Sequence, residues 1–180
     1  MKTYNLKIIL DGSNPQIWRT VKVNGDFTLQ DLHHAIQVSM GWYNCHLHQF
    51  VIANEIYGVN LEDDWGESVN DESKVKICKL LKKGDQFYYE YDFGDGWQHF
   101  IKVLDVTDEN ILFPICTDGK RNCPPEDIGG IYGYENFVEI MKNPKHPEYE
   151  EYIEWHEGSY NPELFDIKEV NKLLAQSFVN

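Results

Sequence analysis

The sequence predicts an α+β fold with a mixed or antiparallel sheet, and three observations support this prediction. The N-terminal part alternates apolar and polar side chains in two short runs and then changes to helical spacing. An aromatic run over residues 87–101 folds back at a cluster of glycine and aspartate residues. The C-terminal part returns to helical spacing. A chain of 180 residues has the usual length of one domain, so we expect a single domain over residues 1–180.

The first predicted element is an antiparallel hairpin. Apolar and polar side chains alternate on both sides of a loop at residues 11–15, although Arg19 interrupts the second run. The alternating apolar residues are Tyr4, Leu6, Ile8 and Leu10 in the first strand, and Ile17, Val21 and Val23 in the second. One face of this hairpin is therefore expected to be buried.

A helix and a third strand are expected to follow. Thr28 is a good N-cap residue with Asp31 three positions on, and Gly41 is suited to end the helix. The buried stripe would consist of Leu29, Leu32, Ile36 and Met40, and residues 46–52 would form the next strand. Because β-grasp folds begin with the same order of elements, we predict a β-grasp-like N-terminal ββαβ unit by analogy.

The middle of the chain contains an acidic stretch followed by further strands. Residues 54–73 include seven acidic side chains with no sustained period, which is typical of a long loop. Residues 75–81 are predicted to form a strand, and the aromatic hairpin follows it.

Two registers compete at the turn of the aromatic hairpin. A two-residue turn at Asp95 and Gly96 is the stronger local signal. A three-residue loop over residues 94–96 instead places Tyr91, Trp97 and His99 with the other apolar side chains on one face. The hydrophobic pattern favours the three-residue loop.

The C-terminal part is predicted to contain helices. Residues 123–134 are too rich in glycine and proline to form a helix or a strand. Helices are expected beyond Tyr132, from Pro147, and after Asp166 as an N-cap.

The hairpin segment Asp92 to His99 and the glycine-rich segment Cys123 to Tyr134 carry unusual chemistry and are predicted to form one ligand site. A hairpin tip cannot supply a pocket alone, so the glycine-rich segment with its two carboxylates is predicted to form the second wall. The candidate ligand-binding residues are Tyr91, Asp92, Asp95, Trp97, His99, Glu126, Asp127, Gly129, Gly130 and Tyr134. Five of them, Asp92, Asp95, His99, Glu126 and Asp127, have side chains that could hold a divalent metal or act as a general base.

The histidines also have a simpler interpretation. His99 can be a histidine packed in the core against tyrosine. His46 and His48 would point to one face of a strand and could bind a metal. They share that face with Phe50 and Ile52, so a structural role is the simpler interpretation.

Composition and the absence of common motifs disfavour several classes of protein. With 30 acidic and 16 basic residues the formal charge is -14, which disfavours binding to nucleic acid. No apolar run approaches the roughly 18 residues of a membrane span, and no signal peptide begins the chain, so we expect a cytoplasmic protein without membrane contact. The four cysteines form no Cys-x-x-Cys pair, and the common nucleotide, hydrolase and zinc-protease motifs do not occur. A divalent metal is the only cofactor that these residues suggest.

Six segments spread over the chain carry patterns that occur together: Pro15 to Arg19, Thr28 to His33, Met40 to Trp42, His46 to Phe50, Tyr91 to His99, and Cys123 to Tyr134. This combination resembles the plasmid ORF-three-like family, first named from an Ri plasmid. The resemblance implies an α+β fold and supports treating the hairpin and the glycine-rich segment as one site. Members are mostly described as uncharacterised, and some are labelled passenger proteins of mobile elements. This chain has Ile128 where the family pattern often has a cysteine.

These observations lead to one functional hypothesis with two alternatives. The leading hypothesis is a noncatalytic binding or interaction module whose partner is a protein or a small molecule. The first alternative is a metal-dependent hydrolase that uses the aspartate, glutamate and histidine side chains named above. The second is an accessory protein of nucleic acids or mobile elements.

Overall fold

An eight-stranded sheet forms the centre of the molecule. The computed structural model describes residues 1–59 and 69–178. The strand order across the sheet is β5-β4-β3-β6-β7-β1-β2-β8, and all neighbouring strands are antiparallel except β4 and β5. The strands are β1 (Thr3–Leu10), β2 (Trp18–Asn24), β3 (His48–Ile52), β4 (Glu55–Gly58), β5 (Asn70–Asp71), β6 (Gln86–Tyr91), β7 (Trp97–Thr107) and β8 (Ile115–Lys120). The predicted α+β class with a mostly antiparallel sheet is confirmed.

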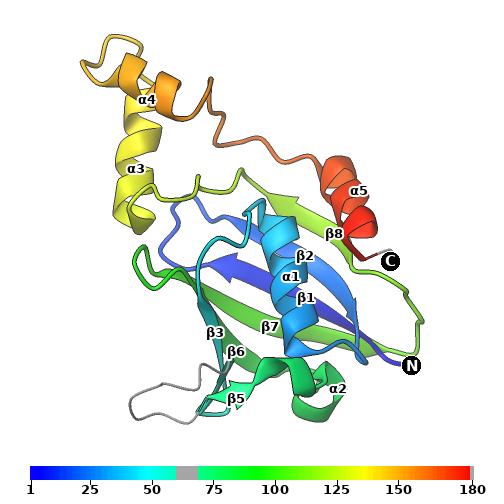
Figure 1. Ribbon diagram of the computed structural model, residues 1–180. Coiled ribbons are helices and arrows are strands. Elements are labelled where there is room, and N and C mark those ends of the chain that lie inside the picture. The colour runs from blue at the N-terminus through cyan, green and yellow to red at the C-terminus, as the bar shows by residue number, and fades with distance from the viewer. Residues whose placement is uncertain (60–68, 179–180) are drawn as a thin grey trace.

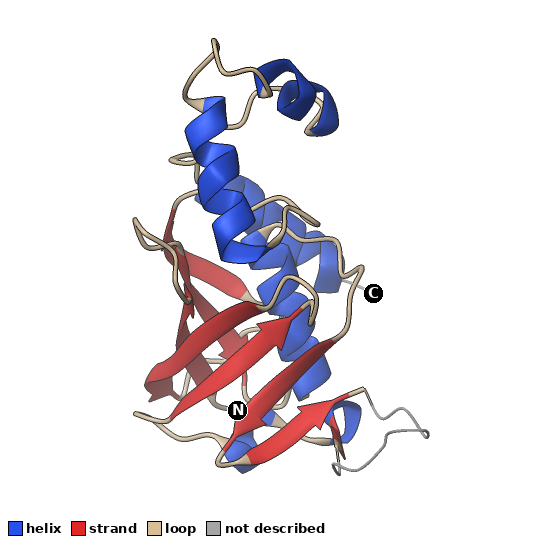
Figure 2. Cartoon of the chain, turned by 90° about the vertical axis from the view of Figure 1, so that its left-hand side faces the viewer, coloured by secondary structure: helices blue, strands red, loops and turns tan. Residues whose placement is uncertain are grey.

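The helices cover one face of the sheet and extend beyond one end of it. Figure 1 shows α1 lying across the sheet and α5 beside β8, and Figure 2 shows α3 and α4 standing beyond the end of the sheet. The helices are α1 (Leu29–Met40), α2 (Ile77–Leu80), α3 (Gly130–Met141), α4 (Tyr149–Trp155) and α5 (Ile167–Phe178), with a short 3-10 helix, η1 (Glu72–Lys74). Among the described residues, no helix has both the length and the apolar character that crossing a bilayer requires.

The N-terminal unit forms as the local signals predict. β1 and β2 pair as an antiparallel hairpin, and their alternating apolar side chains are buried. Thr28 and Asp31 form a complete capping box at the start of α1, and Gly41 ends this helix with a positive φ of 109°. The order β1, β2, α1, β3 is the predicted order of elements. The likeness to β-grasp folds rests on this order of elements alone.

Arg19 explains the interruption of the alternation in β2. Its side chain points into the core, where the residue is only 2% exposed. Nε donates a hydrogen bond to the Ser39 carbonyl (2.8 Å), and Nη1 donates to the carbonyls of Trp18 and Lys120 (both 2.9 Å). The guanidinium carbon lies 4.3 Å from the centre of the Phe165 ring. Arg19 therefore joins α1, β2, β8 and the segment before α5.

The prediction of a strand at residues 75–81 is wrong, because this segment contains the short helix α2. The Leu29 N–H bonds to the Val75 carbonyl, and the Ile77 and Cys78 N–H groups bond to the carbonyls of Phe27 and Gly25. These bonds fold the segment over the start of α1, and Ile77 is fully buried there. The apolar run therefore packs against a helix end instead of extending the sheet.

The acidic stretch at residues 54–73 is only partly a loop. It contains β4, which pairs with β3, and β5, which pairs in parallel with β4. The prediction of a long irregular loop is therefore wrong at both ends of the stretch. Its middle, residues 60–68, lies outside the described residues.

The aromatic hairpin has a longer loop than either predicted register. Tyr91 pairs with Trp97 and Tyr89 with His99, so five residues, Asp92 to Gly96, form the turn. The Gly96 N–H bonds to the Asp92 carbonyl (2.6 Å), and the backbone of Asp92 has a positive φ of 56°. The predicted three-residue register is wrong by two positions. A shift of two preserves the side-chain alternation, so the predicted inward face is observed.

The C-terminal helices also correct one prediction. α3 begins at Gly130, so the end of the segment predicted to be irregular is helical. α5 begins after Asp166, whose Oδ1 accepts the N–H groups of Lys168 (2.9 Å) and Glu169 (3.2 Å), as predicted for an N-cap. The Asn171 side chain bonds both the N–H and the carbonyl of Cys116 (2.8 Å each). α5 thereby occupies backbone groups of the edge strand β8.

Candidate functional site

The hairpin turn and the glycine-rich segment lie side by side, as predicted for the two walls of a site. Oδ2 of Asp95 in the turn accepts a hydrogen bond from the N–H of Gly129 (3.0 Å). Gly130 has a positive φ of 68°, and a Cβ at this position would collide with the Asp95 carbonyl oxygen. A Cβ at Gly133 would collide with the Ile128 carbonyl oxygen. Gly130 therefore permits a close backbone contact between two distant parts of the chain, and Gly133 permits a tight turn within the glycine-rich segment.

Glu126 forms a second link between the two segments. Its Oε1 accepts the N–H of Tyr43 (2.8 Å) and the hydroxyl hydrogen of Tyr91 (3.1 Å), and the Tyr91 oxygen accepts the N–H of Cys45 (2.9 Å). Burial raises the pKa of Tyr91 well above its ordinary value, and the Glu126 carboxylate raises it further. Tyr91 therefore stays protonated and donates to Glu126. The carboxylates of Asp95 and Glu126 thus both hold the hairpin turn and the glycine-rich segment together.

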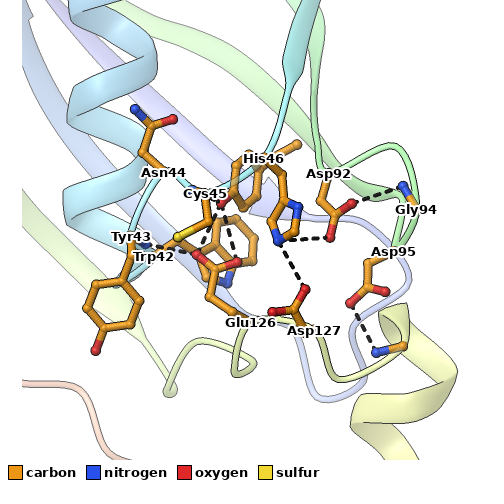
Figure 3. A network of polar contacts seen from close by, with 12 residues as sticks. Trp42, Tyr43, Asn44, Cys45, His46, Asp92, Gly94, Asp95, Glu126 and Asp127 are labelled. Atoms are coloured by element: carbon orange, nitrogen blue, oxygen red, sulfur yellow. Dashed lines mark hydrogen bonds and ion pairs between the residues drawn. The ribbon is translucent and has the colours of Figure 1, made fainter.

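Three side chains converge where the loops meet, as Figure 3 shows. His46 Nε2 lies 3.0 Å from Oδ1 of Asp127 and 3.7 Å from Oδ2 of Asp92. The three ligand atoms lie within 4.8 Å of one another. Neither contact of Nε2 has hydrogen-bond geometry, and this nitrogen is shielded from solvent without a hydrogen-bond partner among the described residues. A histidine nitrogen and two carboxylate oxygens are typical ligands of a divalent transition metal.

Both carboxylates of this cluster are held in unusual backbone positions. Asp92 and Asp127 have positive φ values of 56° and 57°. Asp92 is only 7% exposed, and its Oδ1 accepts the N–H of Gly94 (2.9 Å), which leaves Oδ2 directed at His46. Aspartate adopts a positive φ more readily than most residues with a side chain, because its short polar side chain can form local hydrogen bonds. The turn thus fixes one carboxylate oxygen toward the imidazole.

Three of the predicted site residues lie in the core instead. His99 and Trp97 are 0% and 1% exposed, and the His99 Nδ1 pairs with the Trp97 carbonyl (3.0 Å). The His99 ring packs against Trp42 and Tyr89, with centroids 5.3 and 5.4 Å apart. Tyr134 is buried, and its hydroxyl forms a hydrogen bond with the oxygen of the Tyr160 hydroxyl (3.1 Å). The structure therefore does not place His99 with the carboxylates, because it belongs to the inward face of β7.

His46 is the residue that the sequence-based site set omits. It lies just before β3, outside the regular strand, so its ring does not share the buried face of Phe50. In the sequence, the indication that His46 could bind a metal was its spacing from His48, which is that of two ligands on one face of a strand. The strand begins only at His48, which separates the two rings.

His48 has the structural role that its sequence context predicts. Its Nε2 donates to both oxygens of Glu72 (2.8 and 3.0 Å), and its ring stacks on that of His33 at a centroid distance of 3.4 Å. Gln37 Nε2 donates to the Tyr89 hydroxyl (3.0 Å), which pairs with His33 Nδ1 (2.8 Å), while His33 Nε2 pairs with Asn44 Oδ1 (2.8 Å). When His33 is neutral with its proton on Nε2, each donor in the series Gln37, Tyr89, His33 and Asn44 faces an acceptor.

The close approach at Gly130 supports a specific prediction. Gly130→Ala is expected to lower the free energy of unfolding by about 3–5 kcal/mol, because the added methyl group collides with the Asp95 backbone and the backbone keeps a positive φ. Urea unfolding measures this loss. Gly84→Ala is the matched control, since Gly84 has a φ of 92° and open space around its Cβ position. We expect about 1–2 kcal/mol for the control, and equal losses in the two variants would contradict the packed contact.

Comparisons with known proteins agree with this fold. The pattern of the family described as "Plasmid pRiA4b ORF-3-like protein" matches residues 2–169. The uncharacterised protein y4hQ of Sinorhizobium fredii is 34% identical over 176 residues, which cover 93% of this chain and 88% of that protein. The crystal structure of a protein of unknown function from Methanosarcina mazei, MM3350, superposes with a TM-score of 0.84 at 36% identity, covering 93% of this chain and 97% of that one. On these matches, the chain belongs to the plasmid pRiA4b ORF-3-like family.

Proposed function

We propose that this protein is a noncatalytic binding module that takes a divalent transition-metal ion at the junction of the hairpin turn and the glycine-rich segment. His46, Asp92 and Asp127 are the ligands in this proposal. The observation that carries it is the buried Nε2 of His46, which faces two carboxylate oxygens without a hydrogen bond to either.

The distances from His46 Nε2 to the two carboxylate oxygens support the proposal. Two atoms that bind one zinc ion at about 2.0–2.2 Å lie about 3.3–3.6 Å apart in a tetrahedral site. The observed separations of 3.0 and 3.7 Å lie within a few tenths of an ångström of this range. Three protein ligands leave one position of a tetrahedral ion open, so a further group from a ligand or from water can bind there.

Asp95 and Glu126 support the site without being ligands in this proposal. Their oxygens accept backbone N–H groups of Gly129 and Tyr43 and the hydroxyl of Tyr91. Groups that fix the loops around a metal site contribute to its affinity even when they do not touch the ion. We do not extend the proposal to hydrolysis, because His99, the acid-base group expected from the sequence, is fully buried.

Calorimetric titration with zinc chloride tests the proposal. We expect one zinc ion per chain, and His46→Asn and Asp92→Asn are each expected to weaken binding at least about tenfold, or about 1.4 kcal/mol. The titrations are made with Cys45→Ser as the background, because thiolates are zinc ligands and the exposed thiol of Cys45 stands next to His46.

His146→Asn is the matched control. The His146 side chain is 35% exposed against 30% for His46, and it also lies near a carboxylate, 4.0 Å from Glu148. It has no second carboxylate within ion-pair distance in the described part of the chain. Zinc affinity should be unchanged in this variant. Equal loss in His46→Asn and His146→Asn, or no binding by the parent protein, would contradict a zinc site at His46.

A further inference from the structure

Two hollows lie side by side between the glycine-rich segment and α4. The first, of about 450 Å³, is lined by Tyr43, Pro124, Glu126, Trp155 and Tyr160 among other residues. The second, of about 260 Å³, includes Asp127, Glu151, Tyr152 and Trp155 in its lining. Trp155 forms a wall of both hollows, and Glu126 and Asp127 are neighbours in the chain. We call the two hollows together the α4 groove.

Exposed aromatic rings line the α4 groove, and hydrogen bonds fix the backbone beneath them. Tyr43 is 80% exposed and Trp155 is 46% exposed. The backbone is fixed because the Trp42 indole donates to the Pro124 carbonyl (3.0 Å) and the Tyr160 hydroxyl donates to the Cys123 carbonyl (2.9 Å). Aromatic rings exposed beside a hollow are typical of surfaces that bind peptides.

The charge of the α4 groove determines which peptides suit it. Its lining contains five carboxylates: Glu126 and Glu157 in the first hollow, and Asp127, Glu148 and Glu151 in the second. Of the residues that line the two hollows in the described part of the chain, none is a lysine or an arginine. A cationic occupant would therefore meet carboxylates and the faces of aromatic rings in the same groove.

We propose that the α4 groove is a docking surface for an extended peptide segment that carries arginine side chains. The guanidinium group pairs with carboxylates through two parallel hydrogen bonds and stacks on aromatic faces, so arginine uses both features of the lining. Two hollows separated by Trp155 suit two arginines on one segment. This inference goes beyond the proposed metal site, with which the groove shares only Asp127, and it does not require the metal ion.

Fluorescence anisotropy with a fluorescein-labelled peptide of alternating arginine and serine tests the inference, at about 0.15 M salt to screen long-range attraction. Trp155→Ala and the double variant Glu151→Gln/Glu157→Gln are each expected to weaken binding about tenfold. A peptide with citrulline in place of arginine keeps the shape without the charge and should not bind. The double variant changes only exposed side chains, so it keeps the test valid if Trp155→Ala unfolds α4.

Glu135→Gln/Glu139→Gln is the matched control, because it removes the same charge from exposed positions of α3 outside the groove. Its affinity for the arginine peptide should change by less than about twofold. If this control and the groove variants weaken binding equally, the peptide is held only by the general acidity of the protein and the inference is wrong. His46→Asn should bind the peptide like the parent protein, so the outcome is separate from that of the zinc titration.

Discussion

Arg19→Ala is expected to lower the free energy of unfolding by about 3–5 kcal/mol. The guanidinium is 2% exposed, and burial lowers its pKa below the ordinary value. Among the described residues it has no carboxylate within ion-pair distance, so three backbone carbonyls and the Phe165 ring hold the charge. Truncation leaves these carbonyls without their donor and opens a cavity between α1 and β8. Urea unfolding at neutral pH measures the loss.

Two further variants separate the causes of this loss. Arg19→Met fills most of the volume without a charge or donors, and we expect it to recover part of the stability, to a loss of about 1–3 kcal/mol. Arg19→Lys keeps the charge but has no planar fork to reach three carbonyls, so it should be no better than methionine. A loss below about 1 kcal/mol for Arg19→Ala would contradict the role of Arg19 as a link between elements.

The second large effect is a loss of stability in mild acid. Burial, with a smaller effect of the stacked His48, lowers the pKa of His33 to about 3, and burial lowers the pKa of His99 to about 4. Because the unfolded chain takes up these protons near pH 6.5 and the folded chain does not, stability is complete above about pH 6.5 and falls as the pH decreases. Each histidine contributes about 1.4 kcal/mol per pH unit, so unfolding at pH 4.5 should cost about 4–5 kcal/mol less than at pH 7.

Comparing variants assigns this pH dependence to the two rings. Urea unfolding of the parent protein, His33→Gln and His99→Gln between pH 7 and pH 4.5, with a chelator present, gives the slope of stability against pH. Each single variant is expected to lose about half of the parent slope, and the double variant nearly all of it. Carboxylates also take up protons as the pH approaches 4.5. If the double variant keeps the slope of the parent protein, the pH dependence comes from carboxylates and not from His33 and His99. Zinc is excluded by the chelator because it would bind the folded state and mask the slope.

The elements with strong local signals could be predicted from the sequence. The alternation in β1 and β2, the capping box at Thr28 and the glycine at the end of α1 each act within a few neighbouring residues, and each was observed as predicted. The inward face of the aromatic hairpin was also predictable, since the error in its register was two positions and the alternation of a strand repeats every two. The same period cannot fix the length of the turn.

Two parts of the chain show tertiary contacts that local sequence patterns do not reveal. Residues 75–81 have apolar side chains that suit a strand, but the backbone bonds of this segment go to the start of α1. Arg19 stands at an inward position of β2, where periodicity alone cannot show that the carbonyls of Ser39 and Lys120, in α1 and β8, accept its hydrogen bonds. In both cases, tertiary contacts override the local preference.

The candidate site separates these two kinds of information most clearly. The amino-acid order itself determined that the turn at Asp92 and the segment ending in Gly130 hold carboxylates and glycines suited to a close contact. Only the folded chain decided that His46, rather than His99, meets Asp92 and Asp127. His46, Asp92 and Asp127 stand 46 and 35 positions apart, and residues at such separations have no periodicity in common. Their convergence depends on the packing of loops against the sheet, which local propensity does not encode.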